Sequence, residues 1–217
     1  DLSPEYVMAA VEASLRRLQI EQIDVLLLHR PDPLTHPSET AQALQSLYVS
    51  GKVAAFGVSN YPASHFQALR TVADVPWRAH QIEVSLLHPG VLSEVTWANR
   101  ADAPQPWTGA SDARADAQSA SVELQAWSPL AKGLAPWPPD DANEKAHRIA
   151  GVVAELSEHY HASREAIALA WLTRAGITPV VGTTTAERLR AAAQVRDVVL
   201  SPDDWYRLFA AATAPMP

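Results

Sequence analysis

A regular alternation of short apolar segments with longer amphipathic segments is the feature of this sequence that most constrains its fold. Five apolar, β-branched runs are expected to form strands, and the segments between them carry apolar residues at helical spacing. Strands separated by helices pair in parallel through right-handed crossovers, so the pattern predicts an α/β fold with a parallel sheet. The expected strands lie at 23–28, 53–60, 79–85, 122–129 and 177–182, and the expected helices at 4–18, 38–52, 62–72, 143–160, 163–176, 185–195 and 201–212.

The expected strands run into polar or aromatic residues at their carboxyl ends. The stretch IDVLLLHRPDP (23–33), for instance, passes from a buried-strand pattern to a histidine, an arginine and two prolines. Two architectures fit, a (β/α)8 barrel and an open doubly wound sheet, and the absence of the fingerprint G-x-G-x-x-G weakens the open sheet. Barrel enzymes build their sites at the carboxyl ends of strands. The pattern therefore favours a barrel whose site includes His29, Ser59, Asn60, Gln81, Trp127, Ser128, Gly182 and Thr183.

These residues also have structural interpretations when the sequence is taken alone. A histidine that closes an apolar strand is more often a structural residue than a catalytic one. Ser59 and Asn60 suit the cap of the next helix equally well. Trp127 fits a core position, and an arginine such as Arg188 fits a solvated helix face. The residues by themselves leave these alternatives open.

Composition excludes several classes of function. The 217 residues carry a net charge of −7 and a pI of about 5.6, which gives no electrostatic attraction to nucleic acid or an anionic membrane. The chain has no cysteine, so disulfides, thiolate nucleophiles and cysteine-based metal sites are excluded. No run approaches the roughly 20 apolar residues of a membrane span, and no signal-peptide pattern is visible. We expect a cytoplasmic protein without a metal site.

Five motifs in order carry a family resemblance: IDVLLLHRPDP, GKVAAFGVSNY, HQIEVS, QAWSPLAKG and PVVGTTTAERLRAA. The chain resembles the aldo-keto reductase superfamily over nearly its whole length, residues 95–121 excepted. Within it, the HRPDPL form and the DWYRL ending are similar to the bacterial YdhF-like oxidoreductases. The resemblance implies a (β/α)8 TIM barrel that binds NADPH, less often NADH, and reduces aldehydes or ketones to alcohols by hydride transfer.

The resemblance also implies roles for individual residues near the first three strands. His29 matches the histidine that hydrogen-bonds the substrate carbonyl oxygen, and a neutral imidazole N–H is a suitable donor to a developing oxyanion. Ser59, Asn60 and Gln81 match the residues that hold the nicotinamide carboxamide. That amide offers both an acceptor and a donor, so hydroxyl and amide side chains suit it.

A second group of matches follows the last two expected strands. Trp127 matches the aromatic residue that stacks on the nicotinamide ring, and Ser128 and Leu130 match the loop over the pyrophosphate. The other three matches, Gly182, Thr183 and Arg188, fall in the segment that binds the 2′-phosphate. Many family members carry a lysine where this chain has Gly182, which leaves the choice between NADP and NAD open.

The resemblance covers about five of the family's eight βα units. Residues 1–217 are therefore expected to form a single, N-terminally incomplete aldo-keto reductase domain. The missing part would carry the catalytic tyrosine, lysine and aspartate, so the isolated chain is expected to be inactive. The segment 98–121 has no apolar period and is expected to be an irregular or disordered loop.

Two functions from different classes remain. The first is an NAD(P)H-dependent oxidoreductase acting on a small-molecule carbonyl substrate. The second is a catalytically inactive relative that binds nucleotide or a protein partner. The sequence names neither the carbonyl compound nor the oligomeric state, because specificity in such barrels depends on variable loops.

Overall fold

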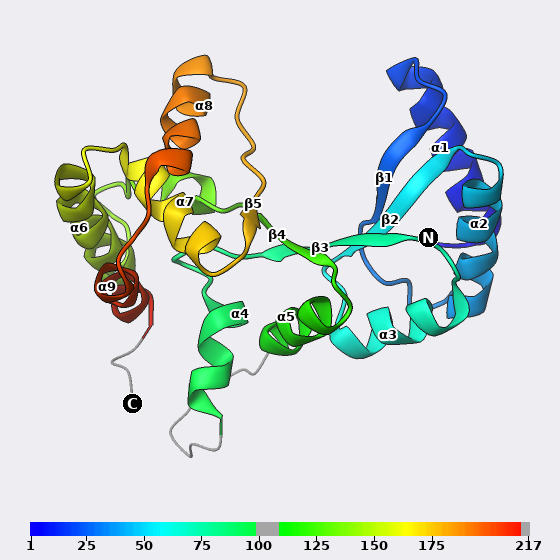
Figure 1. The fold of residues 1–217 in the computed structure, drawn as a ribbon, viewed down its shortest axis with the longest axis horizontal. Helices are drawn as coiled ribbons and strands as arrows, with labels where there is room; N and C mark the ends of the chain where they lie inside the picture. Colours follow the sequence, from blue (N-terminus) through cyan, green and yellow to red (C-terminus); the bar gives the residue numbers. More distant parts are fainter. Residues whose placement is uncertain (99–108, 214–217) are drawn as a thin grey trace. The chain divides into compact units, whose positions relative to one another are not determined.

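The computed structural model describes residues 1–98 and 109–213 (Figure 1). The chain divides into two compact units, which are described separately. The first unit comprises Asp1–Gln81 and Asp112–Glu123, and the second comprises Ile82–Ser111 and Leu124–Pro217. The assignment of residues 1–217 to one domain stays a prediction.

The first unit is built on three parallel strands. Strand β2 lies between β1 and β3, with Leu28 opposite Val58 and Ser59 opposite Gln81, so the carboxyl ends of all three strands lie at one edge. This pairing confirms the predicted parallel order for these strands. The elements are α1 (Pro4–Leu18), β1 (Ile23–Leu28), α2 (Pro37–Val49), β2 (Val53–Ser59), α3 (Ala63–Val72), β3 (Trp77–Glu83), whose last two residues belong to the second unit, and α5 (Ala110–Ser119).

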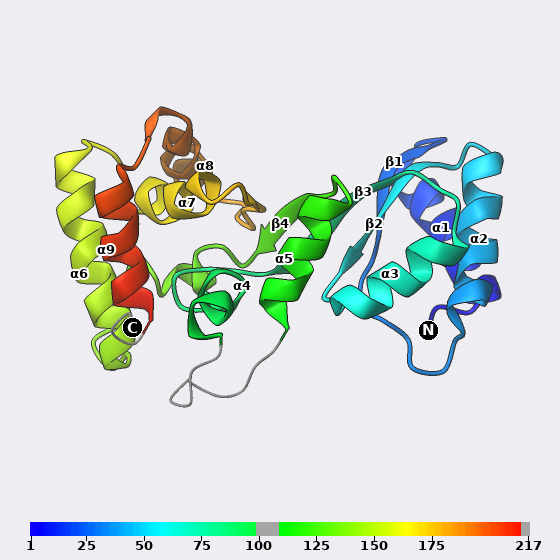
Figure 2. The same ribbon diagram turned by 60° about the horizontal axis from the view of Figure 1, so that its bottom comes forward.

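Apolar faces of helices α1, α2 and α3 pack with the strands into one core. Helix α1 contributes Val7, Val11 and Leu15, which recur at helical spacing, and Phe56 of β2 is fully buried. Figures 1 and 2 show α1 and α2 side by side. Burial on both sides of β2 explains its continuous apolar character, because parallel strands are covered on both faces.

Gly57 lets the three strands approach one another closely. A Cβ atom at this position would collide with the Ala79 carbonyl oxygen of β3 and with Leu27 of β1. The register of β2 against β3 also shifts between Phe56 and Gly57. Only glycine fits this position, which lies two residues before Ser59.

The second unit combines two parallel strands with a layer of helices. Gln125 and Ala126 of β4 pair with Thr178 and Pro179 of β5. Helices α6 and α9 lie side by side (Figure 2), and α7 packs against both. The elements are α4 (Gly90–Ser93), η1 (Glu94–Trp97), β4 (Glu123–Trp127), η2 (Ala131–Gly133), α6 (Glu144–His159), α7 (Arg164–Arg174), β5 (Thr178–Pro179), α8 (Ala186–Ala193), η3 (Gln194–Asp197) and α9 (Pro202–Ala212).

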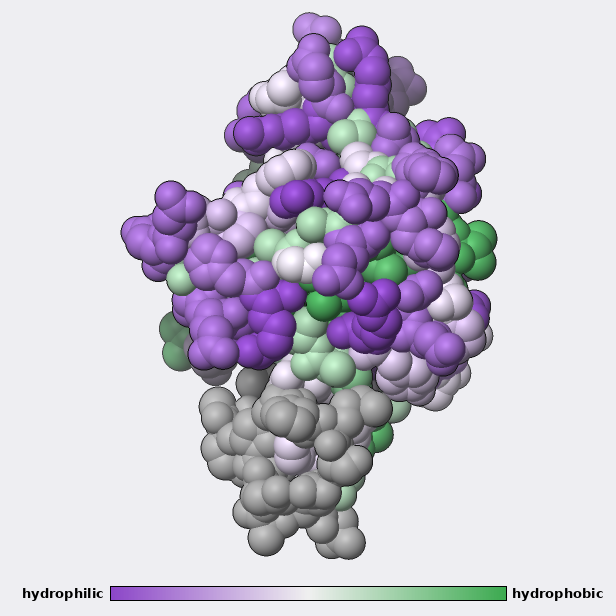
Figure 3. Space-filling model, turned by 90° about the vertical axis from the view of Figure 1, so that its left-hand side faces the viewer, coloured by the Kyte–Doolittle hydropathy of each residue, from purple (hydrophilic) through white to green (hydrophobic). Residues whose placement is uncertain are grey.

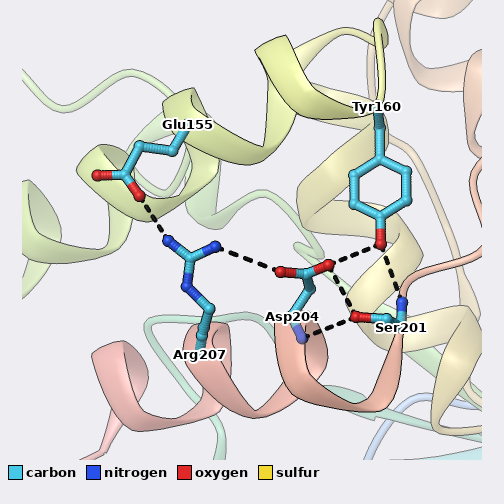
Figure 4. A network of polar contacts seen from close by, with 5 residues as sticks. All are labelled: Glu155, Tyr160, Ser201, Asp204 and Arg207. Carbon is cyan, nitrogen blue, oxygen red and sulfur yellow. Dashed lines mark hydrogen bonds and ion pairs between the residues drawn. The ribbon is translucent and has the colours of Figure 1, made fainter.

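A polar network joins the end of α6 to the start of α9 (Figure 4). The Tyr160 hydroxyl donates to Asp204 Oδ2 over 2.8 Å and accepts the Ser201 N–H over 3.0 Å. Ser201 caps α9, as the sequence predicts, because its Oγ accepts the Asp204 N–H at 3.1 Å. Arg207 links the network to α6 through Glu155 Oε2 at 2.5 Å.

Two predictions of secondary structure are wrong. The segment 98–121 was expected to be irregular, but residues 110–119 form α5, and residues 99–108 lie outside the described part. Helix α5 is rich in alanine, a strong helix former, and Asp116 holds it to α3 through Arg70 at 2.5 Å. The fifth strand was expected over 177–182 but contains only Thr178 and Pro179, after which the Val180 N–H still donates to the Ala126 carbonyl oxygen at 2.9 Å.

The face shown in Figure 3 is mostly hydrophilic, with hydrophobic residues in small separate areas. Scattered apolar residues of this kind are normal on protein surfaces. No helix within the described ranges is both long enough and apolar enough to cross a bilayer.

Candidate cofactor and carbonyl sites

The predicted residues of the first unit meet at the carboxyl ends of β1, β2 and β3. The Asn60 amide group donates to the His29 carbonyl oxygen at 3.3 Å and to Ser59 Oγ at 2.9 Å. The Asn60 backbone N–H donates to the Gln81 carbonyl oxygen at 2.9 Å. Asn60 thus ties the three strand ends together, and it does so in a left-handed conformation (φ 57°) that asparagine tolerates better than most residues.

These side chains differ in their exposure. The His29 side chain is exposed and Gln81 is half-buried, whereas Ser59 is only 4% exposed. A ligand at this edge therefore has direct access to the imidazole. Ser59 contacts Asn60 and contributes to holding that amide in place.

The proline-rich segment after β1 is fixed by Asp32. Its carboxylate accepts hydrogen bonds from the Thr35 hydroxyl at 2.6 Å, the Leu34 N–H at 2.9 Å and the Leu2 N–H at 2.8 Å. These three bonds, the Thr35 bond foremost, lower the pKa of Asp32 to about 2. The sequence motifs predicted no role for Asp32, although an Asp-Pro pair is a recognisable turn signal. The end of IDVLLLHRPDP therefore contains Asp32, which fixes the conformation of this segment, as well as the exposed His29.

The five tyrosines of this chain lie on helices, at a helix end or just after β2. Four of the five lie on helices or at helix ends, and Tyr61 follows Asn60 but is only 6% exposed. Burial, and secondarily the charge of Asp32, raise the pKa of Tyr61, which makes its hydroxyl a poorer acid. Of the three lysines, Lys52 pairs with Glu12 and Lys145 donates to the Leu87 carbonyl oxygen at 2.9 Å.

The second unit holds a cavity of about 750 Å³ beyond the carboxyl ends of β4 and β5. This volume is within the range of small-molecule sites. The cavity wall contains all six cofactor-binding residues that the sequence predicted in this unit: Trp127, Ser128, Leu130, Gly182, Thr183 and Arg188. Trp127 and Arg188, which are 61 positions apart and separated along the chain by α6 and α7, thus line one cavity.

Two cationic side chains line this cavity. Arg188 lies in the first turn of α8, and Lys132 lies in the η2 turn after β4. The N-cap residue Thr185 makes no side-chain capping bond to the first turn of α8. Free N–H groups at a helix start attract anions. The arrangement suits a phosphorylated ligand.

Three charged or aromatic residues that line the cavity were not predicted from the sequence: Lys132, Trp137 and Glu165. Lys132 is in the SPLAKG motif directly after β4, where its position could have indicated a site residue. Trp137 and Glu165 carry no such signal, because they belong to a loop and to α7 and come together only in the folded unit. The Trp137 indole N–H donates to Glu165 Oε1 over 3.2 Å.

Comparisons with known proteins show the family of this chain. A family model described as aldo/keto reductase family matches residues 1–212. The 6-dehydroglucose reductase of Agrobacterium fabrum (strain C58) is 34% identical over 98% of this chain and 64% of its own length. Oxidoreductase YdhF of Escherichia coli (strain K12) is 31% identical over 96% of this chain and 63% of its own length.

A solved structure supports the fold. A thermostable aldo-keto reductase crystallised with the inhibitor epalrestat matches with a TM-score of 0.75 at 22% identity, over 97% of this chain and 67% of that one. The chain spans about 64% of the length of the first curated relatives it matches. Its α/β fold with parallel strands is consistent with part of a TIM barrel. The chain belongs to the aldo/keto reductase family.

Proposed function

We propose that this chain binds NADPH and belongs to an oxidoreductase that reduces aldehydes or ketones to alcohols. The observation that carries the proposal is the cavity of the second unit, which gathers an indole, two cationic side chains and a helix start around one space. Family membership supports oxidoreductase chemistry, and the choice of nucleotide is part of the proposal. NADH is the alternative cofactor.

The residues around the cavity fit the chemistry of such a nucleotide. Trp127 offers a flat apolar surface to a nicotinamide ring, and Arg188 and Lys132 offer charge-assisted hydrogen bonds to phosphate oxygens. The N–H groups at the start of α8 add an electrostatic attraction for the same anions. Bound NADPH supplies the hydride, and the protein binds and orients it.

The residues at the ends of β1, β2 and β3 are proposed to orient the reacting groups. The exposed His29 imidazole donates a hydrogen bond to the carbonyl oxygen, on which negative charge develops during reduction. Asn60 and Gln81 bind the nicotinamide carboxamide, with Ser59 supporting Asn60. The bonds from Asn60 to the His29 carbonyl oxygen (3.3 Å) and from its N–H to Gln81 (2.9 Å) hold these positions in register.

A matched pair of variants on α8 tests the cofactor assignment. Arg188→Ala removes a side chain that lines the cavity, whereas Arg190→Ala removes an exposed one whose guanidinium is 3.9 Å from Glu187. Loss of a charge-assisted bond to the 2′-phosphate predicts about ten- to a hundredfold weaker NADPH binding for Arg188→Ala. NADH binding should change far less, and Arg190→Ala should match the parent.

Fluorescence titration with both nucleotides measures these affinities. Equal weakening of NADPH and NADH by Arg188→Ala would contradict the 2′-phosphate assignment. Absence of any nucleotide binding by the parent chain would contradict the proposed function itself.

One observation favours the inactive alternative for the chain taken alone. Tyr61, the tyrosine closest in sequence to the proposed nicotinamide contacts, is buried and has a raised pKa. Nucleotide binding without NADPH oxidation on any aldehyde would fit this alternative. Turnover that His29→Ala abolishes would instead favour the reductase.

A further inference from the structure

Trp137 is a large aromatic residue left exposed on the cavity wall. Its side chain is 56% exposed, although it lines the same space as Trp127 and Arg188. An exposed aromatic side chain in the wall of a cavity that also contains charged groups is typical of a ligand-binding position. The nucleotide contacts proposed so far for the cavity do not use this indole.

The Trp137 indole is held in place despite its exposure. Its N–H donates to Glu165 Oε1 at 3.2 Å, and the Arg164 guanidinium lies 4.1 Å from the centre of its ring. The Trp137 backbone N–H donates to the Gly133 carbonyl oxygen at 2.9 Å. Both side-chain partners belong to the first turn of α7, whose N-cap Ser163 bonds the Ala166 N–H at 3.2 Å.

Such anchoring reduces the cost of ligand binding. A free surface tryptophan loses rotamer freedom when a ligand fixes it, whereas an indole already fixed by a cation on its ring and a carboxylate at its edge loses little. Cation–π contacts of this kind are worth about 0.5–1 kcal/mol at exposed sites. Trp137 is therefore a preorganised flat surface.

We propose that Trp137 is the platform on which the adenine ring of the bound dinucleotide stacks. The inference rests on the proposed function, because it assigns a second aromatic contact to the same ligand. A dinucleotide carries two planar rings joined by phosphates, and the cavity carries two indoles, Trp127 and Trp137, together with the cations Lys132 and Arg188.

The charge beside Trp137 favours a base over a phosphate. The Glu165 carboxylate lines the cavity next to the indole and repels phosphate oxygens. A neutral purine tolerates this carboxylate, and its amino group can donate to it. Adenine therefore fits this wall better than the phosphate groups do.

Two substitutions of similar bulk test the platform in the 217-residue chain. Trp137→Phe keeps a flat ring, whereas Trp137→Leu keeps apolar volume without one. Val199→Ala is the control, because Val199 is a 75% exposed apolar residue of the second unit that does not line this cavity. Calorimetric titrations use NADPH, 2′,5′-ADP, which lacks the nicotinamide, and reduced nicotinamide mononucleotide, which lacks adenine.

The expected result is selective for adenine. Trp137→Leu should weaken the binding of NADPH and 2′,5′-ADP about tenfold, the lower part of the range for base–aromatic stacking. Trp137→Phe should stay within about threefold of the parent, and Val199→Ala should match it. Binding of the mononucleotide should be the same in all variants. An equal loss for all three probes would indicate a damaged cavity and overturn the inference.

The outcomes separate this inference from the proposed function. If the parent binds NADPH and 2′,5′-ADP and Trp137→Leu binds them equally well, the platform is wrong and the proposed function stands. If the parent binds neither nucleotide, the proposed function fails and the platform fails with it.

Discussion

Removing the Tyr160 hydroxyl should destabilise the second unit by about 2–3 kcal/mol. In the network of Figure 4 this hydroxyl donates to the Asp204 carboxylate at 2.8 Å and accepts the Ser201 N–H at 3.0 Å. A hydrogen bond to a charged group contributes about 1.5–3 kcal/mol, and the unpaired N–H adds a smaller cost. Because the Asp204 side chain is 16% exposed, water replaces part of the loss.

The effect of Tyr160→Phe should depend on pH. Burial by itself raises the pKa of Asp204, but hydrogen bonds from Ser201, Tyr160 and Arg207 lower it overall. A carboxyl whose folded-state pKa is depressed contributes stability above its unfolded pKa, and loses it as the pH falls through the folded pKa. The destabilisation should therefore be full at neutral pH and shrink as the pH falls below about 4.

Urea-induced unfolding followed by far-UV circular dichroism measures this difference. Tyr206→Phe is the control, because Tyr206 lies on α9 with a side chain 52% exposed, and its loss should change stability by less than about 0.5 kcal/mol. A double-mutant cycle with Asp204→Asn should give a coupling of at least about 1 kcal/mol. A Tyr160→Phe protein as stable as the parent at neutral pH would refute the reasoning.

Four further outcomes follow from the structure. Gly57→Ala should destabilise the first unit by at least about 1–3 kcal/mol in urea unfolding, because its Cβ meets the backbone of β3, and a neutral result would contradict this packing. Asp116→Ala, which leaves Arg70 without its buried partner, should cost about 3 kcal/mol in the same assay, whereas the exposed Asp112→Ala should cost almost nothing. Burial lowers the pKa of His80 in the folded protein, so the unfolded chain binds a proton there at a higher pH than the folded chain does. The free energy of unfolding should therefore fall as the pH drops below about 6.5, and His80→Asn should reduce this dependence on pH. The 217-residue chain should not oxidise NADPH with an aldehyde panel, and clear turnover at 340 nm would show that a proton donor has been overlooked.

The sequence by itself determined the alternation of strands and helices. Val7, Val11 and Leu15 recur at helical spacing and are all buried in α1, and the apolar run of β1 has the same bounds, 23–28, in sequence and structure. Such patterns are local, because each residue's burial follows from the period of its own element. Ser163 and Ser201 were recognisable as caps for the same reason, since a cap bonds within its own first turn.

The local sequence pattern predicted secondary structure wrongly where an element is stabilised by residues distant in the sequence. The sequence of α5 has no clear apolar stripe that would predict a helix. The buried Asp116 instead holds α5 in place by accepting hydrogen bonds from Gln67 at 2.9 Å and from Arg70, both more than 40 positions earlier. The fifth strand was predicted too long, because the length of a strand depends on the ladder its neighbour offers.

The candidate site also contains residues that the local sequence predicts and residues that only folding brings together. Motifs predicted site roles for His29, Asn60 and Arg188, because each follows a strand or begins a helix at a position visible in the sequence. Only the tertiary structure decided that Trp137 stands against Arg164 and Glu165, since a loop and a helix start 27 positions apart must fold together to fix that indole. Side-chain contacts between separate elements depend on packing, which no local period encodes.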